Sequence, residues 1–322
     1  NTPSIADSAP TSTRSSSAAL PTLTPLPNPE ATTEVAPVGE VATPILDERI
    51  EDVITGSLVY FAQRDNNFDI YRMTLPDRFE IRLTNNESHE LFPVVSPDGD
   101  RIAYMSDRDG DYDIYVMNMT GMSVRRITTN EVNDRFPAWS PDGDWIAFSS
   151  DVRGDGTDDL YRVRSDGSGM DELYGNGTRN THPRYHPDGD SLAFVSGDPF
   201  DAQTWEIVSL EIASGDVTAL TENEVRDSSP AWMPDGHLLY ASEGEGYAAI
   251  RRMDADGDND VLLYDGTGYE WAVTAYPGGG MLVFTSDETG RDELYVYASG
   301  GRTIQQLTSN GASAAWWVIE DS

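Results

Sequence analysis

The sequence of 322 residues contains no cysteine and no lysine, and it has no run of 18 apolar residues. Without cysteine, neither a disulfide bond nor a thiolate-ligated metal centre can form. Without a long apolar run, we expect no transmembrane helix. All 21 basic residues are arginine, and the sequence has 56 aspartates and glutamates, which gives a net charge of −35 at pH 7. This charge repels nucleic acid and anionic membrane surfaces and attracts cations, so we expect no nucleic-acid partner.

The start of the sequence bears on where the protein works. It begins at Asn1 and shows no apolar signal-peptide segment there, as in a secreted protein whose signal has been removed. The absence of cysteine fits an environment exposed to oxidants. We therefore expect an extracellular or cell-surface location, and a trimmed sequence is the alternative interpretation.

The composition changes near residue 47. Residues 1–46 consist mainly of Thr, Ser, Pro and Ala and contain no aromatic side chain, whereas residues 47–322 hold every Trp, Tyr and Phe. A segment of the first kind cannot build a hydrophobic core. We therefore predict an extended N-terminal arm or linker over residues 1–46 and one folded domain over residues 47–322. The stretch 45–54 at the boundary fits either a short helix or a lead-in strand.

A repeat dominates the folded domain. Five copies share a Pro-x-Gly turn followed by a short apolar run, and an earlier copy that starts at Thr55 lacks the turn. Successive turns lie 43 to 47 residues apart, which is the length of a four-stranded propeller blade. The five copies are SPDGDRIAYMSD at Ser96, SPDGDWIAFSSD at Ser140, HPDGDSLAFVSG at His186, MPDGHLLYASEG at Met233 and YPGGGMLVFTSD at Tyr276.

Each copy predicts four short strands. The first precedes the turn, as in Phe136–Trp139, and the second follows it, as in Ile102–Met105. Such runs are rich in β-branched and aromatic residues and are bounded by Gly, Pro and Asp, which is typical of strands. The third strand recurs at Asp69, Asp113, Asp159 and Glu293, and the fourth recurs as Arg82-Leu83-Thr84, Arg126-Ile127-Thr128, Ala219-Leu220-Thr221 and Gln306-Leu307-Thr308.

The number and order of the copies predict a closed ring. The blade that begins near Leu58 has no first strand before it, and the chain ends with a first-strand pattern, ASAAWWVIE, that no blade follows. Placing Ala315–Trp317 innermost in the first blade supplies the missing first strand and uses the final strand pattern. It also leaves no open strand edge. We therefore predict an all-β, six-bladed β-propeller with four-stranded blades, closed by the C-terminal strand and preceded by the extended arm.

These motifs resemble the repeats of the TolB-like propellers, a WD-type β-propeller family found in many bacterial envelope proteins. The resemblance spans residues 55–322. It implies the propeller fold and the general use of such propellers as protein-binding platforms. TolB carries an additional N-terminal α/β domain for which this sequence shows no counterpart, so the specific role of TolB is not carried over.

Few residues suggest catalysis. The sequence has no G-x-S-x-G nucleophile elbow. His182 and His186 flank a predicted inner strand, and they are either a metal-binding pair, as in some propeller lyases, or ordinary variation of the repeat. We favour the second interpretation and predict that the protein is not an enzyme and requires no cofactor.

Two acidic turns are candidates for binding calcium. Alternating carboxylates on a glycine-containing loop supply the hard oxygen ligands that Ca²⁺ prefers. Neither loop matches an EF-hand, because its glycine falls two positions early and no closing glutamate follows. The alternative, which we favour, is an ordinary Asp/Gly hairpin turn. The first loop carries Asp107, Asp109, Asp111 and Asp113, and the second carries Asp254, Asp256, Asp258 and Asp260.

The arm has an apolar pattern of its own. Aliphatic side chains recur every three residues, which matches the three residues per turn of a polyproline II helix. They would form a stripe about 65 Å long at ~3.1 Å per residue. An exposed stripe of this length needs a surface to pack against. The stripe residues are Leu20, Leu23, Leu26, Val35, Val38 and Val41.

Three classes of function follow from these observations. In the first, which we expect, the protein is a non-enzymatic extracellular structural protein whose arm docks on a neighbouring subunit and links propellers into a homopolymer or filament. In the second, it is a surface-tethered receptor that binds a protein, peptide or glycan at the propeller mouth, with the arm as a flexible stalk. The third class, a propeller lyase or lactonase, requires a polar metal cluster that the sequence does not show.

Overall fold

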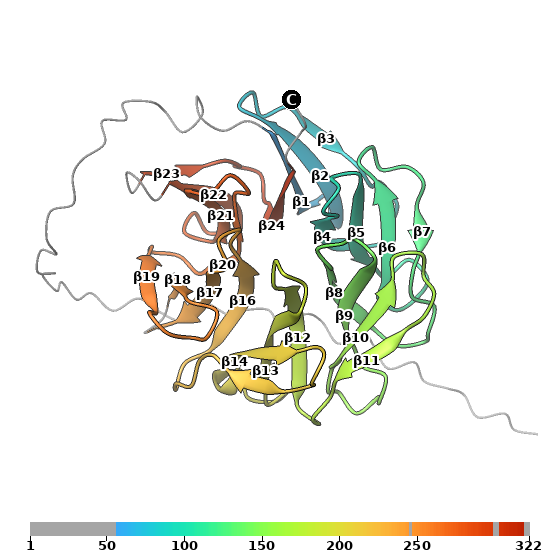
Figure 1. Ribbon diagram of the computed structural model, residues 1–322. Helices are drawn as coiled ribbons and strands as arrows, with labels where there is room; N and C mark the ends of the chain where they lie inside the picture. Colours follow the sequence, from blue (N-terminus) through green and yellow to red (C-terminus); the bar gives the residue numbers. More distant parts are fainter. Residues whose placement is uncertain (1–55, 245–246, 299–302, 319–322) are drawn as a thin grey trace, which may run out of the picture. The chain divides into compact units, whose positions relative to one another are not determined.

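The computed structural model describes residues 56–244, 247–298 and 303–318. In this part of the chain, 24 strands form six antiparallel sheets of four strands each. The sheets stand as blades around a central axis, with one strand of each blade innermost (Figure 1). The predicted six-bladed propeller is therefore confirmed, whereas the stretch 45–54 and the boundary near residue 47 lie outside the described residues.

The first three blades each run through four strands from the axis outward. The first blade comprises β24 (Ser313–Val318), β1 (Gly56–Arg64), β2 (Asn67–Leu75) and β3 (Glu80–Arg82); the second comprises β4 (Glu90–Val95), β5 (Arg101–Ser106), β6 (Asp113–Asn118) and β7 (Arg125–Arg126); the third comprises β8 (Asp134–Trp139), β9 (Trp145–Ser150), β10 (Asp159–Arg164) and β11 (Asp171–Tyr174).

The remaining three blades repeat the same order. The fourth blade comprises β12 (Arg179–Tyr185), β13 (Ser191–Gly197), β14 (Glu206–Glu211) and β15 (Val217–Ala219); the fifth comprises β16 (Asp227–Trp232), β17 (Leu238–Glu243), β18 (Ala248–Met253) and β19 (Val261–Tyr264); the sixth comprises β20 (Glu270–Ala275), β21 (Met281–Ser286), β22 (Glu293–Ala298) and β23 (Thr303–Gln306). A 3-10 turn, η2 (Ala202–Thr204), precedes β14.

The Pro-Asp-Gly segments form the turns between the first and second strands of the second to fifth blades. In the second blade, the amide of Gly99 donates a hydrogen bond of 2.9 Å to the carbonyl of Ser96, and Gly99 has a φ of 75°. Proline presets φ at the second position of such a turn, and glycine tolerates the positive φ. The repeated sequence motif therefore sets the same tight turn in successive blades.

The C-terminal strand closes the ring as predicted. β24 pairs antiparallel with β1, and Trp317 lies opposite Leu58 while Trp316 lies opposite Val59. Leu58 is fully buried and Trp317 is 3% exposed. Burial of a large apolar side chain stabilises a fold by about 1.5–3 kcal/mol, so the C-terminal strand is an integral part of the first blade.

One aromatic side chain per blade anchors the core at the same position of the second strand. In four blades this ring stacks on the tyrosine of the third strand, as Tyr104 does on Tyr115 with centroids 5.8 Å apart. Because these rings face the neighbouring blades, the core is distributed between blades. The six aromatic residues are Tyr60, Tyr104, Phe148, Phe194, Tyr240 and Phe284.

The outermost strands are shorter than the sequence predicted. β3 ends at Arg82, so Leu83 and Thr84 follow the strand, although we predicted all three within it. The amide of Leu83 still donates to the carbonyl of Ile70 at 2.8 Å, but the amide of Ile70 donates to the Thr84 hydroxyl at 2.9 Å. A side-chain oxygen thus replaces a backbone acceptor, and the ladder ends there.

Candidate functional site

The six innermost strands share a backbone irregularity near the axis. Each shows a register shift against its neighbouring strand, and the residue at the shift has a φ between 48° and 55° although it is not glycine. Such a conformation is unfavourable for residues with a Cβ, so the surrounding structure must hold it. A bulge of this kind re-aims side chains. The bulge residues are Phe92, Phe136, His182, Ser229, Ala272 and Ala314.

Aromatic rings from these bulges gather around the axis. Phe136 stacks on His182 with ring centroids 3.7 Å apart, and Phe92 contacts Phe136 edge-on at 4.7 Å. The ring of Trp271, next to the bulge of the sixth blade, lies 6.3 Å from that of Phe92. The centre of the propeller is therefore partly filled by side chains that come from different blades.

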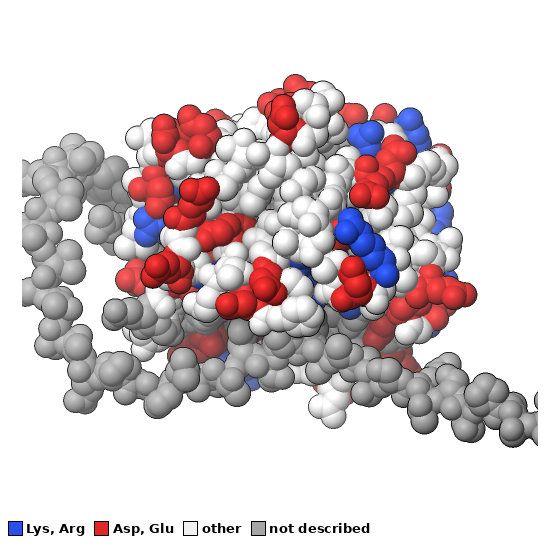
Figure 2. Space-filling view, turned by 90° about the horizontal axis from the view of Figure 1, so that it is seen from below, with Lys and Arg blue, Asp and Glu red and all other residues white. Residues whose placement is uncertain are grey.

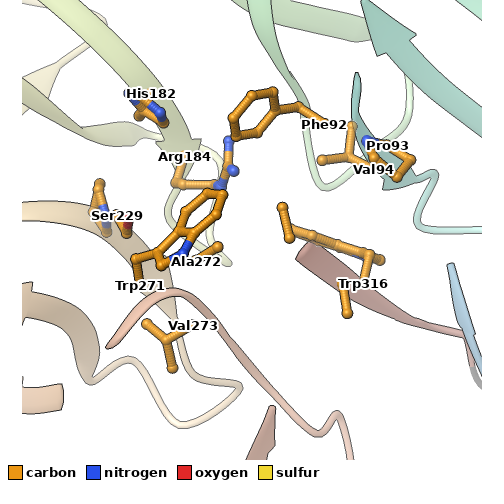
Figure 3. A pocket seen from close by; sticks show the side chains of 13 residues that line it. Phe92, Pro93, Val94, His182, Arg184, Ser229, Trp271, Ala272, Val273 and Trp316 are labelled. Carbon is orange, nitrogen blue, oxygen red and sulfur yellow. The ribbon is translucent and has the colours of Figure 1, made fainter. Parts of the chain in front are cut away.

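A cavity of about 30 Å³ remains beside these rings. It is lined by side chains of several blades, and Figure 3 shows Arg184, Trp271, Phe92 and Trp316 around it. One water needs roughly 10–15 Å³ by the same measure, so the cavity has room for about two waters. The lining is mostly apolar with a few polar groups, and the volume suits a small chemical group rather than a whole ligand.

Arg184 is the charged residue of this lining. It lies two positions after the bulge residue His182, where the other blades carry uncharged side chains. Its Nη1 donates to the carbonyl oxygen of Pro183 at 2.8 Å and to that of Pro137 at 3.5 Å. The corresponding residues in the other blades are Val94, Ala138, Ala231, Thr274 and Trp316.

The electrostatics of the cavity are set by burial. Desolvation lowers the pKa of Arg184 to about 10, so the guanidinium stays charged at neutral pH. Desolvation, and then the nearby Arg184 charge, hold the pKa of His182 well below its usual value, so the imidazole is neutral. The cavity therefore presents one positive charge among aromatic and neutral groups.

His182 lies within β12 and His186 directly follows it, and the two side chains have different neighbours. His182 stacks on Phe136 at the axis, whereas the Nδ1 of His186 lies 2.8 Å from Asp188 and its ring packs on Trp232 at 4.5 Å. In residues 56–244, 247–298 and 303–318, no group of three or more His, Asp or Glu side chains is placed to hold a metal ion. The two imidazoles thus have separate partners.

The first acidic loop lies between β5 and β6, and its carboxylates face different partners. Asp107 accepts a backbone N–H at 2.8 Å. Asp109 and Asp113 lie 3.4 and 2.6 Å from Arg126. Asp113 is buried, and burial raises its pKa to about 6. Burial also raises the pKa of Asp111.

The second acidic loop connects β18 to β19. Asp254 accepts the N–H of an asparagine side chain at 2.7 Å, and Asp256 accepts the backbone N–H of Asp258 at 3.1 Å. Asp260 forms an ion pair with Arg251 at 2.5 Å. In both loops, several carboxylates are already hydrogen-bonded to local N–H groups or paired with an arginine. Calcium binding by these loops stays a prediction.

The predicted docking residues of the arm, Leu20 to Val41, lie outside the described residues.

Arg184 is the site residue that the sequence reasoning missed. The local signal was present, because the fourth copy reads HPRYHPDG where the third reads FPAWSPDG. The two histidines of this segment were the conspicuous candidates, and the arginine between them was not considered. Its position at the cavity depends on how the blades are arranged around the axis, which the local sequence does not show.

The fold is a six-bladed propeller with a small, mostly apolar cavity at its axis. The sequence matches the family described as PD40, the TolB beta propeller domain, over residues 55–132 and 108–274. Because these matches span more than half of the chain, the protein belongs to the TolB β-propeller family.

Individual relatives are more distant. The chain is 37% identical over 85 residues to the uncharacterized protein Atu1656 of Agrobacterium fabrum, which is 26% of this chain and 29% of that protein. TolB from Acinetobacter baumannii has a similar structure, with a TM-score of 0.69 and 20% identity over 82% of this chain and 66% of that one. A putative TolB from Agrobacterium tumefaciens gives a TM-score of 0.66 and 22% identity over 81% and 91%. The chain thus spans less than a third of the curated relative, and the structural similarities show the fold.

Proposed function

We propose that this protein is a non-enzymatic interaction module that works outside the cytoplasm, secreted or at the cell surface, and binds a partner protein at the opening of its central cavity. The observation that carries this proposal is the cavity itself, where bulged strands from several blades bring aromatic rings and one guanidinium together. Aromatic residues and arginine are the residue types that contribute most to protein-binding hot spots.

Two further observations support the proposal. The chain belongs to a propeller family whose fold suggests a role in protein interaction. Acidic side chains are spread over the face shown in Figure 2, and the net charge of −35 opposes nucleic-acid binding. In the described part of the chain, no helix is long and apolar enough to cross a membrane. No cofactor is required by the proposed function.

A peptide-display experiment tests the proposal. A library of random linear peptides should yield sequences that bind the wild-type propeller, and Trp271→Ala should lose them, because this ring lines the cavity. Phe200→Ala is the matched control, since Phe200 is 89% exposed and lies outside the cavity lining. Peptides that bind both variants equally would place binding elsewhere, and a library without enrichment would count against the module.

The period-three stripe of the arm supports a second candidate, in which the partner is another copy of this chain. Burial of six aliphatic side chains contributes on the order of 10 kcal/mol, at ~1.5–3 kcal/mol each. Ordering the arm opposes this gain, and its prolines reduce the opposing entropy. The arm would then link propellers into a head-to-tail polymer.

Deleting residues 1–44 separates this candidate from a flexible stalk. The shortened protein should fold and remain monomeric in light scattering, whereas the full chain should form larger species. Changing Leu23, Leu26, Val35 and Val38 to Ser should have the same effect as the deletion. A monomeric full chain at high concentration, or a polymer formed by the shortened protein, would exclude the arm as the link.

A further inference from the structure

Arg184 combines two features, because it lines the central cavity and has no carboxylate partner among the described residues. Many other arginines lie close to acidic side chains, such as Arg108 at 3.0 Å from Glu90 and Arg153 at 2.7 Å from Asp159. Among the described residues, no Asp or Glu lies within 4.0 Å of the Arg184 guanidinium, in a chain with a net charge of −35. A desolvated cation without a counter-ion is costly, so this position favours an anion from outside the chain.

The donors of Arg184 that remain available suit a bidentate ligand. Both hydrogen bonds of the guanidinium use Nη1, toward the carbonyls of Pro183 and Pro137. Within the described residues, Nε and Nη2 have no hydrogen-bond acceptor, and the side chain is partly exposed where it faces the cavity. A planar guanidinium offers two parallel N–H groups that match the two oxygens of a carboxylate.

The dimensions of the cavity select among anions. A volume of about 30 Å³ accommodates roughly two waters, which is the space that the two oxygens of a carboxylate need. A phosphate or sulfate brings four oxygens, about twice what this volume holds. The walls contributed by Trp271, Phe92 and Trp316 are aromatic, and the Trp316 ring lies 5.8 Å from the guanidinium carbon of Arg184. Such walls exclude water and strengthen an ion pair.

We propose that Arg184 binds the C-terminal carboxylate of a partner polypeptide, and that this carboxylate enters the cavity between Phe92, Trp271 and Trp316 while the rest of the polypeptide lies outside it. This inference rests on the proposed binding function and names its ligand chemistry. The carboxylate group alone fits a cavity of this size, and a chain end carries such a group on its backbone, whereas an internal segment does not. The acidic surface repels a run of acidic residues, so a single terminal charge is favoured over an Asp- or Glu-rich segment.

Two small probes test this chemistry on the wild-type protein. N-acetyl-leucine carries a free carboxylate, and N-acetyl-leucinamide is its uncharged counterpart. The acid should shift the tryptophan fluorescence, because Trp271 and Trp316 line the cavity, and it should bind at least tenfold more tightly than the amide, as expected for a charge-assisted pair. Equal binding of the acid and the amide overturns the inference. Tighter binding of N-acetyl-aspartate N-methylamide than of N-acetyl-leucine overturns the assignment to a chain terminus.

Variants locate the binding. Arg184→Met should lose at least tenfold in affinity for N-acetyl-leucine, and Arg164→Met should lose none. Arg164 is the matched control because its guanidinium also lies over a tryptophan ring, that of Trp145 at 4.4 Å, outside the cavity lining. Unchanged affinity in folded Arg184→Met overturns the inference. If that variant does not fold, the comparison of acid and amide on the wild-type protein decides alone.

Display libraries separate this inference from the broader proposal. One library presents peptides with free C-termini, and the other presents the same peptides inside a loop. Enrichment from the free-terminus library alone supports a carboxylate site. Equal enrichment from both overturns the carboxylate inference and leaves the binding module standing, and enrichment from neither overturns both.

Discussion

Replacing Glu288 with arginine should stabilise the propeller at alkaline pH, because the change would give a buried carboxylate in the sixth blade a partner. Glu270 opens β20 and Glu90 opens β4 at equivalent positions, and both are fully buried. Each accepts a hydrogen bond from the serine that ends the next strand, at 3.1 Å from Ser286 and 2.9 Å from Ser106. The two sites therefore share their geometry.

The sites differ in the residue two positions beyond that serine. In the second blade this residue is Arg108, whose guanidinium lies 3.0 Å from Glu90. In the sixth blade it is Glu288, which is also acidic. Burial, followed by repulsion from neighbouring carboxylates that include Glu288, raises the pKa of Glu270 to about 8. Burial raises the pKa of Glu90 as well, and Arg108 is among the groups that oppose this shift.

The magnitude follows from the shift. The pKa of Glu270 rises from 4.5 to about 8, which corresponds to about 5 kcal/mol at ~1.4 kcal/mol per pKa unit. Relaxation and water penetration reduce this upper bound. We therefore expect ionised Glu270 to lower the free energy of unfolding by about 2 kcal/mol at pH 9. The folded state keeps a proton that the unfolded state loses between about pH 4.5 and 8, so this group lowers the free energy of unfolding as the pH rises through that window.

Chemical denaturation at pH 5, 7 and 9 measures the effect. Glu270→Gln and Glu288→Arg should gain stability relative to the wild-type protein as the pH rises, and the gain should level off above about pH 8. Glu90→Gln is the matched control, and its gain with rising pH should be smaller, because Arg108 opposes the rise in the pKa of Glu90. Parallel pH profiles for wild type and Glu270→Gln would refute the reasoning, as would equal effects of Glu270→Gln and Glu90→Gln.

Three further predictions follow from the fold. Deleting residues 312–322 should abolish cooperative unfolding, because it removes β24 and exposes the edge of β1; an unchanged calorimetric melt would rule out this role. Trp232→Phe should lower the free energy of unfolding by about 1 kcal/mol, because the indole N–H of Trp232 donates to the Arg184 carbonyl of the preceding blade at 3.1 Å, and urea denaturation measures the loss. Calcium should raise the melting temperature at concentrations where magnesium does not if the acidic loops bind it specifically; equal shifts from both ions would leave general screening of the charge.

The sequence alone was sufficient to predict the propeller, its six blades and the closure by the C-terminal strand. The reason is that each of these features is encoded locally and repeatedly. The Pro-Asp-Gly turn needs neighbouring residues only, as Ser96 and Gly99 show. An incomplete first blade and an unused final strand pattern leave one pairing that closes the ring, and Trp317 lies opposite Leu58 accordingly.

The acidic loops show where local pattern stopped being informative. The alternating carboxylates predict calcium ligands but do not show that Asp113 lies beside Arg126 of the next strand, β7, or that Asp260 pairs with Arg251 across a hairpin. Spacing along the chain does not reveal which arginine reaches which carboxylate. These pairings depend on how the strands are placed in each blade.

The central cavity was decided by the tertiary structure. Phe92, His182, Arg184, Trp271 and Trp316 are far apart in the sequence, and they meet because inner strands of different blades are bulged toward one axis. The sequence shows an arginine where other blades have Val, Ala, Thr or Trp, but it does not show what surrounds that arginine. Its lowered pKa and its lack of a carboxylate partner among the described residues are consequences of long-range packing, to which no local motif refers.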